Sequence, residues 1–96
     1  MATIEISRSH NLGLADAKLR AEQLAKDLEG KLGIGWNWQG DDIRFKADSG
    51  TAKGASGIVK VTSSVVRVEI DLPFLLKAMK GMISGKVEEK LDKLLA

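Results

Sequence analysis

His10 is the only histidine in the chain and therefore the first candidate for proton transfer or metal binding. Histidine titrates near neutral pH, which suits it to both tasks. A metal site, however, needs three or four ligands, and the sequence has no cysteine, no second histidine and no clustered carboxylate spacing. Catalysis also needs a nucleophile or an acid–base partner, which the sequence does not place. We therefore favour a structural role, in which His10 bonds to backbone at a turn between a strand and a helix.

No other catalytic motif is recognisable. Asp41 and Asp42 are adjacent, but neighbouring aspartates in a tight turn point in different directions. The glycine-bearing segments at 33–35 and 53–57 do not match a phosphate-binding loop, and there is no Gly-x-Ser-x-Gly element. The sequence thus predicts no catalytic, cofactor-binding or metal-binding residues, and we expect a protein that is not an enzyme.

Trp36 and Trp38 lie two residues apart, so in a strand they share one face. Such a pair could form a platform for a carbohydrate or an apolar ligand. Large aromatic side chains in a small domain more often belong to the core, since each buries ~150–250 Å². Their apolar neighbours on the same predicted face, Ile34, Ile43 and Phe45, favour the core.

Size and composition narrow the functional classes further. The 96 residues are enough for one domain, which we place at 1–96. The net charge is only +2, and acids and bases are interleaved, so we expect no binding to nucleic acid. The start of the chain lacks a signal-peptide pattern, and no apolar run approaches the ~20 residues of a membrane span. With no cysteine, these features predict a cytoplasmic protein.

Seven elements must position these residues. Alternation of apolar and polar residues predicts strands, and apolar spacings of three and four predict helices. Each strand has one apolar and one polar face, as in an antiparallel sheet covered on one side. The fold class is therefore α+β, in the order β-α-β-β-β-β-α, with both helices packed on one face. The expected elements are strands at 2–7, 34–39, 43–47, 54–62 and 66–72, and helices at 14–32 and 74–95.

The predicted boundaries depend on particular residues. Ser9 or Asn11 can cap the first helix, and Gly30 and Gly33 can end it. Gly54 and Gly57 predict a weak strand with a bulge. A turn is expected at 49–51, and Pro73 suits the first turn of the last helix.

The last helix provides the most promising surface. Its apolar stripe should face the sheet, whereas two mid-helix glycines lie away from that stripe and each cost ~1 kcal/mol relative to alanine. Close approach of another helix would explain them, either from a second copy of the chain or from the first helix. The stripe consists of Leu76, Met79, Ile83, Val87, Leu91 and Leu94. A second set of residues, which we call the contact surface, consists of Phe74, Leu75, Ala78, Gly81, Met82 and Gly85.

Two motifs at opposite ends of the sequence carry a family resemblance. The first is Arg8-x-His10-x-Leu12-Gly13, and the second is Leu91-Asp92-x-Leu94-Leu95, preceded by the segment 74–83. With five strand-like segments between them, the chain resembles the polyhydroxyalkanoic acid system proteins of bacteria over nearly its whole length. The residues of the first motif are interpreted as structural.

The resemblance implies a non-enzymatic accessory protein of polyhydroxyalkanoate storage, located at granules or bound to granule proteins. The contact surface is the expected point of attachment, and sheet edges that can pair across two copies favour a homodimer. The alternative is a module that binds a small hydrophobic ligand, such as an acyl chain, in a cavity between the sheet and the C-terminal helix. A pocket below ~300 Å³ would count against that alternative.

Overall fold

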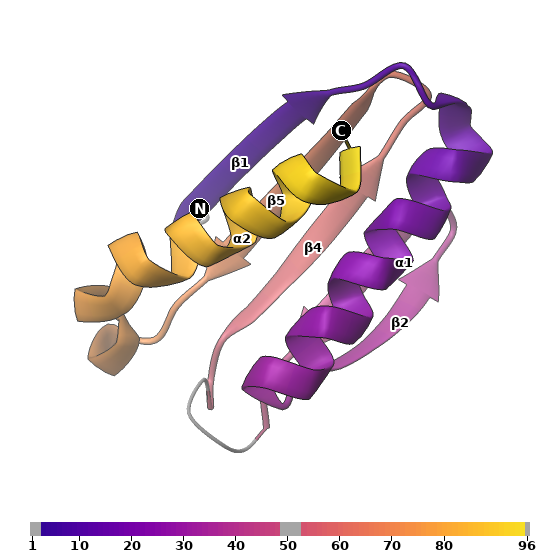
Figure 1. The fold of residues 1–96 in the computed structure, drawn as a ribbon. Helices are drawn as coiled ribbons and strands as arrows, with labels where there is room; N and C mark the ends of the chain where they lie inside the picture. The colour runs from indigo at the N-terminus through magenta and orange to yellow at the C-terminus, as the bar shows by residue number, and fades with distance from the viewer. Residues whose placement is uncertain (1–2, 49–52, 96) are drawn as a thin grey trace.

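The fold is a five-stranded antiparallel sheet with both helices on one face, seen in a computed structural model that describes residues 3–48 and 53–95 (Figure 1). The strand order is β1-β5-β4-β3-β2, so β1 and β2 form the edges. The predicted fold class and element order are confirmed. The strands are β1 (Ile4–Ser9), β2 (Gly35–Gln39), β3 (Asp42–Lys46), β4 (Ser56–Val61) and β5 (Val65–Asp71).

The helices are α1 (Gly13–Leu32) and α2 (Lys80–Leu95), the latter preceded by a 3-10 helix, η1 (Phe74–Met79). They lie side by side over the sheet, α1 across β2 to β4 and α2 along β1 (Figure 1). The core fills the space between these layers because alternate strand residues, such as Ile6, Val68 and Ile43, point at the helices. Small residues on α1, Ala17 and Ala21, are almost fully buried there.

The first helix begins differently from the prediction. Leu12 is its N-cap and makes no side-chain capping bond, so a cap by Ser9 or Asn11 was wrong. Gly13 opens the helix with φ +78°, a conformation that favours glycine. At the other end, Gly33 takes the left-handed conformation and its N–H donates to the Glu29 carbonyl, as predicted, whereas Gly30 lies inside the helix and does not end it.

The glycine at position 57 has a packing role rather than a bulge. Pairing of β4 runs without interruption from Ser56 to Lys60 with β3 and from Ser56 to Val61 with β5, so there is no bulge at Gly57. The predicted bulge lies at Gly54, where φ is +93°. The Gly54 N–H donates to the Ala47 carbonyl and the Ala47 N–H donates to the Ala55 carbonyl, so two residues oppose one, as in a G1 bulge. A Cβ at Gly57 would lie 2.5 Å from the Phe45 ring, which therefore occupies the space above the strand. The turn expected at 49–51 lies outside the described residues.

The predicted last helix is two elements. Pro73 is extended, with φ −65° and ψ 160°, and the first turns that follow are 3-10 rather than α-helical. The Leu76 N–H donates to the Pro73 carbonyl at 2.9 Å, the i to i+3 hydrogen bond of a 3-10 helix. Pro73 offers no side-chain cap, so this tighter turn pairs one of the first backbone N–H groups of η1. The regular helix starts only at Lys80.

Both tryptophans pack against the core while staying half-buried, as expected of side chains on an edge strand. Trp36 faces Phe45 across the strand pair, and Trp38 faces Ile43. Along α2, Ile83, Val87 and Leu91 are buried, and the stripe residues Leu76, Met79 and Leu94 are half-buried against them. The predicted apolar stripe is therefore confirmed.

Candidate functional site

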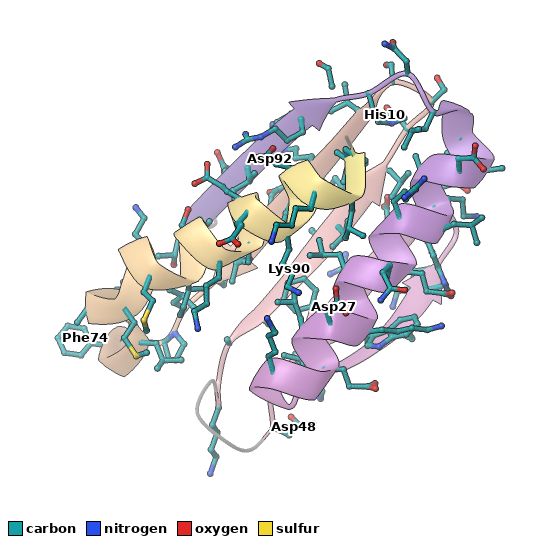
Figure 2. All side chains as sticks on the ribbon, in the orientation of Figure 1. His10, Asp27, Asp48, Phe74, Lys90 and Asp92 are labelled. Carbon is teal, nitrogen blue, oxygen red and sulfur yellow. The ribbon has the colours of Figure 1, made fainter. Side chains whose placement is uncertain are left out.

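His10 lies at the turn between β1 and α1, with only 7% of its surface exposed (Figure 2). Its Nδ1 accepts a hydrogen bond from the Leu12 N–H at 3.1 Å, and its Nε2 lies 3.1 Å from the Thr62 carbonyl. A carbonyl only accepts, so Nε2 carries the proton and donates it. The His10 N–H also donates to the Ser64 carbonyl at 2.8 Å. These contacts join the start of α1 to the turn between β4 and β5.

Arg8 connects the same region to α2. Its guanidinium donates to Asp92 Oδ1 at 2.8 Å and to Glu88 Oε1 at 3.1 Å, and the hydrogen bond to Asp92 is the main reason why the pKa of Arg8 is raised. Asp92 belongs to the second sequence motif, so the two motifs, 84 residues apart, meet in the fold. We call Arg8, His10, Leu12 and Gly13 the Arg8–His10 corner. Its hydrogen bonds connect separate elements of the fold, which indicates a structural role.

The predicted contact surface lies at the opposite end of the helical layer. Phe74 projects from the start of η1 with 84% of its surface exposed, and Met82 is 52% exposed (Figure 2). Ala78, Gly81 and Gly85 are exposed as well. The side chain of Leu75 lies outside the described part of the structure. Apart from that residue, the members of the surface are open to solvent.

The two mid-helix glycines do not accommodate the first helix. Among the described atoms, none outside the local helix lies within 4 Å of a Cβ built at Gly81 or Gly85. One of the two predicted explanations, close packing against α1, is therefore wrong. The other, approach by another molecule, remains a prediction.

Trp38 is anchored rather than free to form a platform with Trp36. Trp38 Nε1 donates to Glu22 Oε1 at 3.0 Å, and this hydrogen bond is the main reason why the pKa of Glu22 is lowered. The Lys18 ammonium lies 5.0 Å from the centre of the same ring, within cation–π range. These contacts hold β2 against α1.

The uncovered face of the sheet carries matched charges. Glu69 accepts from Lys60 and from Arg67, each at 3.2 Å, and Arg67 also lies 3.4 Å from Glu5. The hydrogen bond from Lys60 is the main reason why the pKa of Glu69 is lowered. A shallow hollow of about 580 Å³ lies on this face, with Ile58 among its lining residues. The charges around Glu69 are therefore paired with one another.

A groove of about 510 Å³ lies between α1 and α2. The predicted cavity was placed between the sheet and α2, but that space is filled by Ile83, Val87 and Leu91, so the predicted location was wrong. Lys31, Lys86 and Lys90 line the groove. The sequence gives only a partial indication of this cluster: Lys86 and Lys90 are four residues apart beside Val87, whereas Lys31 comes from another helix.

Two features of the described residues bear on wider classes of function. Within 3–48 and 53–95, no three His, Asp or Glu side chains gather closely enough to hold a metal ion. None of the helices in these ranges is long and apolar enough to cross a membrane.

Comparison with known protein families gives a match over nearly the whole chain. The family model described as "Putative polyhydroxyalkanoic acid system protein" (PHA_gran_rgn) matches residues 4–95. No curated protein and no solved structure matches the chain significantly. The match includes both motifs that meet through Arg8 and Asp92. The chain therefore belongs to the polyhydroxyalkanoic acid system protein family.

Proposed function

We propose that this protein is a non-enzymatic accessory protein of polyhydroxyalkanoate storage that attaches to the granule through its contact surface. In this proposal it acts in the cytoplasm, at the granule. Family membership supplies the storage context. The observation that carries the attachment is Phe74, a large apolar side chain exposed over 84% of its surface at the tip of η1.

The chemistry of the contact surface suits a polyester. Phe74 and Met82 offer apolar side chains to the hydrocarbon part of the polymer, and burial on a granule would gain roughly 25 cal/mol for each Å² removed from water. The exposed backbone beside Gly81 and Gly85 allows a flat surface to approach closely. Lys77 and Lys80 are exposed on the same segment and can keep their charges in water while their stems contact the polymer.

The test is co-sedimentation with polyhydroxybutyrate nanoparticles. The variant Phe74→Ser with Met82→Ser removes the two large side chains that are exposed in the described part of the contact surface. The matched control is Leu19→Ser, which removes a 64% exposed leucine from α1. We expect saturable binding by the wild type and by Leu19→Ser, and loss of binding by the double variant.

Two other results would contradict granule attachment by this surface. The wild type could fail to bind the particles, or all three proteins could bind equally. Sedimentation velocity on the same proteins tests homodimerisation. A dimer that dissociates only in the Phe74→Ser, Met82→Ser variant would assign the surface to a second copy of the chain instead.

A further inference from the structure

The groove between α1 and α2 has an apolar floor. Leu28 from α1 and Val87 from α2 are buried at 6% and 1% exposure, and Ile83 is buried at 9%. Met79 and Leu76 are half-buried at one end. The volume, about 510 Å³, falls within the roughly 300–1,000 Å³ range of small-molecule sites. The groove is therefore large enough for a flexible apolar chain.

The rim of the groove carries an excess of positive charge. Three lysines line it, Lys31, Lys86 and Lys90, against two acids, Asp27 and Glu89. Lys90 and Asp27 face each other across the space between the helices, with Nζ 3.7 Å from Oδ2 (Figure 2). Proximity of Lys90 is the main reason why the pKa of Lys31 is lowered, and Lys86 adds to the effect. The fold thus holds several ammonium groups together beside an apolar surface.

We propose that this groove binds a fatty carboxylate, with the acyl chain on the apolar floor and the carboxylate between the lysines. A carboxylate accepts hydrogen bonds from several ammonium groups at once, and charge-assisted bonds of this kind are stronger than neutral ones. The same charges would repel a cationic amphiphile. The two proposals share Met82, which belongs to the contact surface and also lines the groove. The rim lysines and the buried floor residues belong to the groove alone, so the inference does not rest on granule attachment.

The floor can be observed directly through its methionines. Met79 and Met82 both line the groove, so ¹³C-methyl methionine NMR reports on its occupation. The probe is decanoate, added below its micelle concentration, and the two signals are assigned with Met79→Leu and Met82→Leu. We expect saturable shifts of both methyl signals with decanoate, weaker shifts with decanol, and none with decyltrimethylammonium.

The charge requirement has its own matched variants. Lys31→Gln with Lys86→Gln removes two rim lysines and leaves the Lys90–Asp27 pair intact. Lys77→Gln with Lys80→Gln removes two exposed lysines that do not line the groove. We expect decanoate to bind the first variant roughly 2- to 30-fold more weakly, the effect of two exposed ion pairs, and the second as tightly as the wild type.

Several results would overturn this proposal. Methyl signals of Met79 and Met82 that do not respond to decanoate would do so, as would equal responses to decanoate and the cationic probe. Equal loss of affinity in both lysine variants would reduce the effect to net charge. The Phe74→Ser variant separates the two proposals, since it should lose particle binding while decanoate binding stays unchanged.

Discussion

The Arg8–His10 corner and the groove between the helices differ in how the fold treats charge. At the corner, the Arg8 guanidinium has two acidic partners, and its pKa is raised. In the groove, Lys31 lies near two other lysines, and its pKa is lowered. A domain of this size has little stability to spare. The corner therefore contributes to holding the fold together, whereas the groove retains a repulsion that a negatively charged ligand would relieve.

The largest effect should come from the core residues of α2, near the point where Asp92 bonds to Arg8. Leu91 is 1% exposed, so Leu91→Ala should lower the free energy of unfolding by about 2–5 kcal/mol, because it leaves a cavity in the core. At the other end of the helical layer, Met82→Ala removes a half-exposed side chain and should change it by no more than about 0.5 kcal/mol. Urea denaturation measures both, and similar losses would abolish the distinction between the two ends.

The next effect should come from the histidine. His10→Ala leaves the Leu12 N–H and the Thr62 carbonyl without their partner, and should lower the free energy of unfolding by about 1–3 kcal/mol. His10→Asn should lose less, because an amide oxygen can accept from the same N–H. Chemical denaturation of both variants tests this. Unchanged stability in His10→Ala would rule out the structural interpretation of this residue.

A smaller effect is expected from the ion pair between Arg8 and Asp92. Both side chains are partly exposed, at 35% and 58%, so their coupling should be about 0.2–1 kcal/mol. A double-mutant cycle with Arg8→Ala and Asp92→Ala measures the coupling, which should weaken as salt is added. No coupling at low salt would mean that the link between β1 and α2 depends on packing alone.

The smallest effect is expected in the groove, where removing a lysine should raise the free energy of unfolding instead of lowering it. The pKa of Lys31 is lower in the folded state, so below it the folded protein bears a repulsion that the unfolded chain lacks. Lys31→Met should therefore be more stable than the wild type at neutral pH. As pH rises from that lowered pKa to the usual lysine value of about 10.4, wild-type stability should increase relative to the variant.

Thermal denaturation at pH 7 and above pH 10 checks whether the stability advantage of Lys31→Met shrinks as pH rises. The control is Lys77→Met, which removes an exposed lysine outside the groove. If Lys31→Met were less stable than the wild type at neutral pH, the groove would not store a repulsion between lysines.

The fold was accessible from sequence because local pattern determines it. Alternation in β5, where Val66, Val68 and Ile70 face the helices, requires no knowledge of distant residues. The start of α1 could not be predicted in this way. The Leu12 N–H donates to the ring of His10, and that ring is held by the Thr62 carbonyl, 52 residues away from His10. The tight turn at Phe74 was missed for a similar reason: Pro73 permits both helix types, and the available backbone bonds decide between them.

The candidate sites also differ in how far the sequence predicts them. Exposure of Phe74 and Met82 agrees with the helical wheel, because each lies off the apolar stripe of its own element. The groove needs two helices at once. Lys31 and Lys90 are far apart in sequence, and only the packing of α1 beside α2 brings their charges together. No spacing rule along a single helix could have found that cluster.

The strand order has a consequence for folding during synthesis on the ribosome. During synthesis β1 leaves the ribosome before the other described strands, yet its one neighbour in the sheet is β5. Ile4 and Ile6 must therefore wait for Val68 and Ile70 before they are paired. Arg8 waits longer still, until Asp92 has been added 84 residues later. Strands β2 to β5 can zip together by successive hairpins, whereas the first strand made is completed only once nearly the whole described chain exists.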